Sequence, residues 1–154
     1  GGPYHQLFEK ECPITTANFL GYVNSGFYDG TIFHRVIPGF VAQGGGMLPG
    51  MKEKENGAPI KNEAATAPAN VRGTLAMART SDPNSATSQF YINLRDNTSL
   101  NYAGPRNPGY CAFGKVVEGM ETADAMAGVA TGNRGPHGDV PKDDIVLKKA
   151  RVVQ

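Results

Sequence analysis

An arginine, several aromatic rings and an amide come close together between residues 33 and 46. The stretch reads FHRVIPGFVAQGGG. An alternating strand would place Phe33 and Arg35 on one face and His34 on the other. A turn at Pro38-Gly39 would then bring back a second strand, on which Val41 and Gln43 share a face. The stretch thus contains a guanidinium, an aromatic ring and an amide within nine residues, from Arg35 to Gln43.

A second stretch, SQFYIN over 88–93, has the same character. Alternation places Gln89 and Tyr91 on one face, with Phe90 behind them. Each residue alone has an ordinary interpretation. A strand arginine is usually a solvated charge or an ion-pair partner, a buried Tyr or Phe belongs to a core, and a strand glutamine is an exposed polar residue.

Other catalytic chemistries find little support. The chain has no Gly-x-Ser-x-Gly elbow, and the glycines at 44–46 are not followed by the Lys-Ser/Thr pair of a phosphate loop. The three histidines, His5, His34 and His137, are far apart and form no HxH or HExxH pattern. Classes that need a nucleophile, a metal or a nucleotide are disfavoured, and we expect neither metal nor cofactor.

The elements that must position these residues are short. Two segments have helical spacing, at about 15–25, with Thr15 or Thr16 as a cap, and at about 120–127. Seven others favour strands, at 4–8, 31–36, 40–43, 74–78, 89–93, 111–117 and 145–152. Short strands separated by Gly, Pro and Asn are typical of sandwiches and barrels. The stretch 44–70 is the longest connection and is therefore either functional or mobile.

Composition narrows the class of protein. The 154 residues include 20 Gly and 11 Pro, yet 40% are hydrophobic and 19% charged, which indicates one loop-rich folded domain. The net charge is +1 with both signs scattered, so no nucleic-acid-binding arm is indicated. The longest apolar runs fall far short of the ~20 residues that span a bilayer, and we expect no membrane partner.

Two cysteines bear on the compartment. Cys12 and Cys111 are far apart in the sequence and form no CxxC motif. Two free thiols are favoured over a disulfide, so we expect a cytoplasmic protein, with a periplasmic or secreted one as the alternative.

The string over 33–45 resembles the signature of the cyclophilin-type peptidyl-prolyl cis-trans isomerases. Further motifs lie where that family places them, at 18–19, 73–79, 85–90 and 113–120, so the resemblance covers nearly the whole chain from about residue 6. The tripeptide Ala78-Arg79-Thr80, and Tyr110 in place of a histidine, are similar to bacterial members.

The resemblance implies a fold and an activity. The fold is a closed eight-stranded antiparallel β-barrel capped by two helices, over one domain at 1–154. The family's first strand has no clear counterpart upstream of Tyr4, and it would be absent or supplied by another chain. The activity is rotation about X-Pro peptide bonds of polypeptides, assisting protein folding without a covalent intermediate.

The resemblance also implies a site. Its catalytic residues would be Arg35, Phe40 and Gln43. Its substrate-binding residues would be Val41, Met77, Ala78, Arg79, Thr80, Gln89, Tyr91, Leu100 and Tyr110. Two positions depart from the family. Tyr91 replaces a phenylalanine and its hydroxyl needs a partner, and Ser99 replaces an aromatic residue associated with cyclosporin, so we expect weak cyclosporin binding.

Two other functions stay open beside the enzyme. One is a binding or chaperone module that holds proline-containing segments without turnover. The other is a structural partner in a larger assembly, suggested by the unpaired barrel edge. The presence of Arg35, Phe40 and Gln43 together favours an active enzyme, which we expect to be a monomer.

Overall fold

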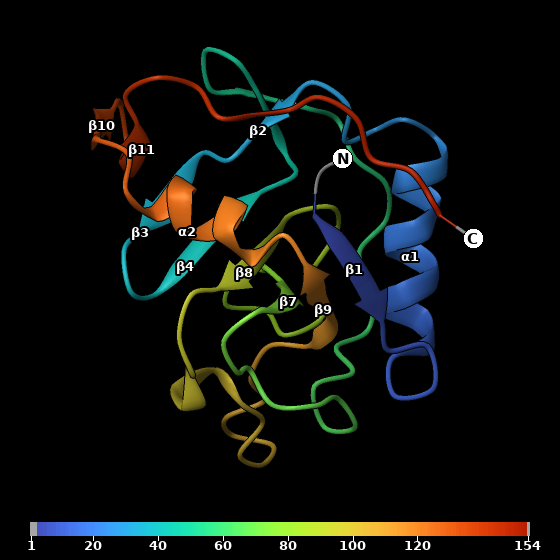
Figure 1. Ribbon diagram of the computed structural model, residues 1–154. Coiled ribbons are helices and arrows are strands. Elements are labelled where there is room, and N and C mark those ends of the chain that lie inside the picture. The colour runs from blue at the N-terminus through green and yellow to red at the C-terminus, as the bar shows by residue number, and fades with distance from the viewer. Residues whose placement is uncertain (1–2, 154) are drawn as a thin grey trace.

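Three antiparallel sheets and two α-helices make up residues 3–153, the part that the computed structural model describes (Figure 1). The largest sheet has six strands in the order β1 (Tyr4–Leu7), β9 (Ala112–Glu118), β7 (Thr74–Met77), β8 (Phe90–Asn93), β4 (Val41–Gly44) and β3 (Arg35–Ile37). A second has four, in the order β12 (Val146–Leu147), β2 (Thr31–Ile32), β5 (Met47–Leu48) and β6 (Lys52–Glu53). The third is a hairpin of β10 (Thr131–Arg134) and β11 (His137–Pro141).

The six-stranded sheet carries apolar side chains on both of its faces. Leu75, Met77, Phe90, Ile92 and Phe113 point to one face and belong to the main core, on which both helices pack. Their neighbours along the same strands point the other way and form a second, smaller apolar cluster. Strand alternation therefore divides the apolar residues between a core that holds the fold together and a separate surface.

Helix α1 (Pro13–Asn24) begins two residues earlier than expected. Proline fits the first helical position because its missing N–H has no partner there in any helix. Neither threonine caps this helix. The Glu63 carboxylate instead accepts hydrogen bonds from the backbone N–H groups of Ile14 and Thr15, at 3.2 and 2.6 Å, and from the Thr15 hydroxyl at 2.7 Å. A carboxylate at a helix N-terminus satisfies free N–H groups and is favoured by the helix dipole.

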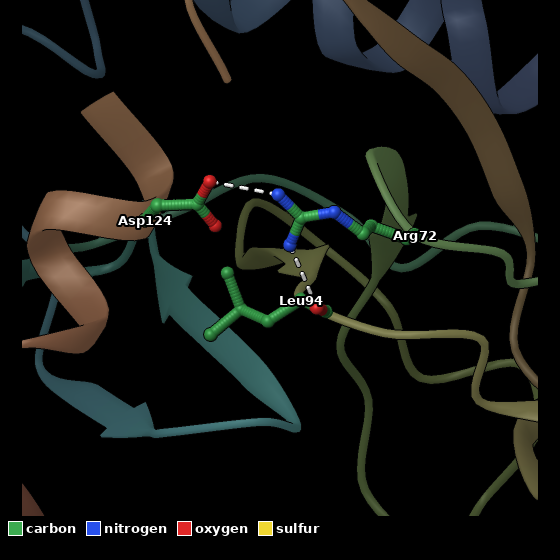
Figure 2. A network of polar contacts seen from close by, with 3 residues as sticks. All are labelled: Arg72, Leu94 and Asp124. Carbon is green, nitrogen blue, oxygen red and sulfur yellow. Dashed lines mark hydrogen bonds and ion pairs between the residues drawn. The ribbon is translucent and has the colours of Figure 1, made fainter. Parts of the chain in front are cut away.

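Helix α2 (Met120–Ala127) has the bounds that the sequence predicted. Ala123 and Met126 face the core. Figure 2 shows how the helix is tied to the large sheet, because the Arg72 guanidinium contacts the Asp124 carboxylate at 2.7 Å and donates to the Leu94 carbonyl at 2.9 Å. One exposed ion pair and one buried acceptor thus set the position of α2 beside the end of β8.

The strand expected at 31–36 is broken into two. Phe33 turns into the core, where its ring meets Phe90 edge-on with centroids 6.0 Å apart, whereas Arg35 is exposed. The prediction that these two side chains share a face is therefore wrong. The reason is that Phe33 donates its backbone N–H to Ile145 while Arg35 pairs with Gln43, so the chain passes from one sheet to another between them.

Other boundaries also differ from the prediction. The stretch 44–70 contains β5 and β6, the hairpin β10–β11 was missed, and only Val146–Leu147 of the last predicted strand pairs. These pieces are too short or too polar to show a two-residue period.

Within residues 3–153 the strands form separate sheets and no closed ring, and a strand before Tyr4 would fall outside that range. Neither of the two helices described is long and apolar enough to cross a membrane.

Candidate functional site

A single lateral row of residues crosses five strands of the large sheet. Arg35 on β3 pairs with Gln43 on β4, and Gln43 pairs with Tyr91 on β8. Tyr91 pairs in turn with Ala76 on β7, and Ala76 with Ala112 on β9. Residues opposite one another on antiparallel strands project from the same face. The pairing register thus sets an exposed guanidinium at one end of a row that ends in small apolar side chains.

The apolar part of this face is the second cluster of the fold, called here the pocket cluster. It comprises four buried residues and four partly buried ones, namely Val41, Ala76, Tyr91 and Ala112 with Phe40, Ala78, Leu100 and Tyr110. Tyr91 and Tyr110 meet edge to face with ring centroids 6.1 Å apart. Alanines at the centre and aromatic rings at the margin make a surface suited to a small, flat apolar group.

A chain of side-chain hydrogen bonds borders the pocket cluster. Arg35 Nη1 lies 3.4 Å from Gln43 Oε1, and Gln43 Nε2 donates to Gln89 Oε1 at 3.0 Å. The Gln43 amide is therefore held from both ends, with its oxygen toward the guanidinium. Gly46 makes room for this arrangement, because a Cβ there would lie 2.5 Å from Gln89 Cγ.

Arg79 forms a second cationic border. Its guanidinium stands 4.2 Å from the centre of the Tyr110 ring and donates to the Gly109 carbonyl from Nη2 at 2.9 Å. A cation over an aromatic face is stabilised by the ring quadrupole. Arg79 thereby fixes the orientation of Tyr110, which forms one wall of the pocket cluster.

Behind the pocket cluster lies a network of buried amides centred on Asn70. The Tyr91 hydroxyl donates to Asn70 Oδ1 at 3.0 Å, and Asn93 Nδ2 donates to the same oxygen at 3.1 Å. Asn70 Nδ2 lies 3.1 Å from the carbonyl of Tyr110 and 3.3 Å from that of Leu100. One side chain thus reaches three residues of the pocket cluster.

Burial shifts the pKa values of two residues, Tyr91 and His34. Burial raises the pKa of the Tyr91 phenol well above its usual value, so the hydroxyl is a hydrogen-bond donor at any physiological pH. Burial, followed by the charges of His137 and Arg35, lowers the pKa of His34 to about 4. His34 Nδ1 has no hydrogen-bond partner among the described residues.

Most of the residues predicted for the site lie together. Phe40, Val41, Ala78, Tyr91, Leu100 and Tyr110 are all in the pocket cluster, and Arg35, Gln43, Gln89 and Arg79 border it. Two residues do not join them. Met77 points to the opposite face and is buried in the main core, because its neighbour Ala76 takes the pocket side. Thr80 is exposed and bonds to Ser85 in the following turn.

Three residues of this face were missed in the sequence. Ala76 and Ala112 are small and carry no chemical signal, although alternation from Tyr91 and its partners would place them. Asn70 lies in the long connection that showed no periodicity. The signal that would have found it is the Tyr91 hydroxyl, since a buried phenol requires an acceptor.

Comparisons with known proteins identify the family. The family model described as "Cyclophilin type peptidyl-prolyl cis-trans isomerase/CLD" matches residues 4–152. Peptidyl-prolyl cis-trans isomerase B of Escherichia coli is 54% identical over 96% of this chain and 91% of its own. Peptidyl-prolyl cis-trans isomerase A of Dickeya dadantii is 53% identical over 96% of this chain and 77% of its own.

Solved structures agree with this. The crystal structure of a Cryptosporidium parvum cyclophilin-type peptidyl-prolyl cis-trans isomerase, determined in the presence of the dipeptide Ala-Pro, superposes with a TM-score of 0.82 at 31% identity. The match covers 99% of this chain and 92% of that one. The chain has a mainly β cyclophilin fold with two helices, and it belongs to the cyclophilin-type peptidyl-prolyl cis-trans isomerases as a bacterial-like member.

Proposed function

We propose that the row from Arg35 to Ala112 is the place where this isomerase rotates the amide bond before a proline. The observation that carries the proposal is the register. It aligns the Arg35 guanidinium, the Gln43 amide and the Tyr91 ring across three adjacent strands. The proline ring would lie on the pocket cluster, and the prolyl nitrogen would face the guanidinium.

The chemistry matches what this face offers. Rotation about an X-Pro bond has a barrier of about 20 kcal/mol and takes ~10–100 s without a catalyst. Amide resonance is lost as the bond twists, so the lone pair returns to the prolyl nitrogen. A guanidinium, which stays protonated at all relevant pH values, donates to that lone pair only in the twisted state. Arg35 would thereby bind the transition state more tightly than either planar form.

The bordering residues would position the substrate. Gln43 and Gln89 hold the guanidinium side of the row, and the segment that begins at Ala78 would lie beside the polypeptide on either side of proline. Arg79 would not touch the substrate itself but would hold the Tyr110 ring in place beside it. The apolar surface would select for proline because a five-membered ring can cover a small apolar patch beside aromatic side chains without burying an N–H. The substrate class is therefore a flexible proline-containing polypeptide.

The direct test is exchange spectroscopy by NMR on a short peptide with one Ala-Pro bond. We expect catalytic amounts of the protein to raise the cis-trans exchange rate well above that of the free peptide. Binding of the peptide without faster exchange would contradict the proposal and would leave the chain a binding module.

Three finer features belong to this proposal. We expect the sheets to be part of a closed eight-stranded barrel, the chain to act as a monomer, and the compartment to be the cytoplasm. The closed barrel is supported by the large sheet, in which six strands already follow one another without a gap. Light scattering after size exclusion and fractionation of cells test the other two.

A further inference from the structure

The two cysteines lie side by side in the core although 99 positions separate them in the sequence. Their Sγ atoms are 3.4 Å apart, and both are buried free thiols. Cys12 directly precedes α1, and Cys111 directly precedes β9. We propose that Cys12 and Cys111 form a dithiol site that a small disulfide compound oxidises to an internal disulfide, joining the start of α1 to the wall of the pocket cluster.

The distance between the sulfurs supports the proposal first. A disulfide needs an Sγ–Sγ distance of about 2.05 Å, so each sulfur would move by less than about 1 Å. Both residues lie next to an element end, where small changes in side-chain torsion do not break a ladder of backbone bonds. Cys12 Sγ is also 3.5 Å from the Ala112 carbonyl, which places it beside the backbone that follows Cys111.

The surroundings of the two thiols differ and set the order of attack. The hydrogen bond with Cys12 lowers the pKa of Cys111 despite its burial, and the Thr15 hydroxyl 3.6 Å away acts in the same direction. The same thiol hydrogen bond, together with burial, raises the pKa of Cys12. Because the thiolate is the nucleophile in disulfide exchange, Cys111 is the residue that reacts first.

The exposure of the two cysteines also indicates that Cys111 reacts before Cys12. Cys111 is 3% exposed and lines a small pocket, with room for about one water molecule, together with Thr15, Met77 and Arg79. Cys12 is 0% exposed. A small reagent would therefore reach Cys111 first, once this pocket widens, and Cys12 would then be reached from the sulfur of Cys111.

The reaction is two exchange steps. The Cys111 thiolate attacks one sulfur of the reagent, the reagent's S–S bond breaks, and its other half leaves as a thiolate that takes a proton from water. Cys12 then attacks the Cys111 sulfur, and its proton passes to the departing thiolate of the reagent. The mixed S–S bond breaks and releases the second thiol. The protein loses two hydrogens and the reagent is reduced to two thiols.

The bond would connect α1 to the site by a short path. Tyr110, a wall of the pocket cluster, precedes Cys111 directly, and the Cys111 carbonyl accepts a hydrogen bond from Met77 N at 3.1 Å. The disulfide would also close a long loop and so restrict the unfolded chain. We therefore expect the oxidised protein to melt roughly 5–15 °C higher than the reduced one.

The test treats the folded, reduced protein with hydroxyethyl disulfide. Intact-mass measurement should show the loss of two hydrogen atoms, and peptide mapping should join the peptide that contains Cys12 to the one that contains Cys111. Cys12→Ser should instead retain one mercaptoethanol unit on Cys111, because the second attack is removed. Cys111→Ser, the matched control, should stay unmodified over the same time.

Three outcomes would overturn the proposal. They are wild-type protein that keeps both thiols, wild-type protein that stops at a stable mercaptoethanol adduct, and Cys111→Ser protein that reacts as fast as Cys12→Ser. The wild-type result decides the matter even where a serine variant fails to fold, since the cross-linked peptide is read from the natural chain. An unchanged melting temperature after oxidation would contradict the link between α1 and β9.

Discussion

The Tyr91 hydroxyl donates a hydrogen bond to Asn70 Oδ1 across 3.0 Å, from the pocket cluster to a side chain that is itself 1% exposed. The Tyr91 hydroxyl therefore has a buried acceptor and needs no contact with solvent. Its hydroxyl is bound to Asn70, which is not a member of the row that begins at Arg35. The same Asn70 oxygen also accepts from Asn93, which makes Asn70 the common support of this wall.

Tyr91→Phe should lower the free energy of unfolding by about 1 kcal/mol, because one buried hydrogen bond is lost while Asn70 keeps its other partners. Asn70→Ala should cost more, about 3 kcal/mol, since it leaves several buried donors and acceptors unpaired. Urea unfolding measures both. Tyr102→Phe is the matched control, because that ring is 42% exposed. Strictly additive effects in the double variant would show that the two side chains are not coupled.

Arg35→Ala should reduce kcat/KM for an Ala-Pro peptide roughly 30-fold to 1000-fold. This corresponds to an activation free energy higher by about 2–4 kcal/mol, the cost of removing one preorganised donor. The thermal midpoint should stay where it is, since the side chain is exposed. Arg106→Ala, a change at another exposed arginine, should leave both quantities unchanged. Near wild-type turnover in Arg35→Ala would exclude the proposed mechanism.

Gly46→Ala should displace the Gln89 side chain, because the new Cβ would lie 2.5 Å from Gln89 Cγ. The Gln43–Gln89 bond would be lost, and we expect kcat/KM to fall by about 1 kcal/mol, roughly fivefold. In a Gln89→Ala background the same glycine change should cost little further activity, because the atoms it meets are gone. A full additional loss there would rule out Gln89 as the cause.

Gly21→Ala is the contrasting glycine change. Gly21 is inside α1, and a Cβ added there would meet no atom of residues 3–153 within 4 Å other than the backbone of the helix itself, so alanine adds helix propensity without a clash. We expect an increase of about 0.5–1 kcal/mol in the free energy of unfolding and unchanged turnover. A loss of stability would mean that this face of α1 contacts another part of the molecule.

Acid should weaken the fold through His34. Its pKa is about 4 in the folded chain, against 6.5 for an ordinary histidine, so the unfolded chain binds more protons between those two pH values. This contribution, about 3 kcal/mol, is complete above pH 6.5 and is lost as the pH falls toward 4. His34→Leu should flatten the pH dependence of urea unfolding over that window.

Ser99 bears on drug binding. It is exposed in a short 3₁₀ helix (Thr98–Leu100) next to Leu100 of the pocket cluster. The family resemblance places an aromatic residue here in many members. We expect weak cyclosporin binding by calorimetric titration, and tighter binding by Ser99→Trp because a large ring adds buried apolar area. Tight binding by the natural chain would contradict the expectation.

Much of this molecule follows from local pattern. The bounds of α2, the positions of the central strands, the opposed faces of Phe90 and Tyr91 and the shared face of Val41 and Gln43 all come from periods of 3.6 and 2 residues, which short-range geometry imposes. Arg35 and Gln43 of the family signature lie opposite one another for the same reason, since they are on two strands joined by one turn.

Other features depend on contacts between distant residues. The break at Phe33–His34 exists because two sheets compete for adjacent residues, and the cap of α1 comes from Glu63 in another segment. Met77 leaves the site because its neighbour Ala76 takes the pocket side. Asn70 beneath Tyr91 and Cys12 beside Cys111 are likewise long-range pairs. The sequence alone determined which residues could do the chemistry, whereas only the tertiary structure decided which side chains support them, because burial and hydrogen bonding between distant segments leave no periodic trace in the chain.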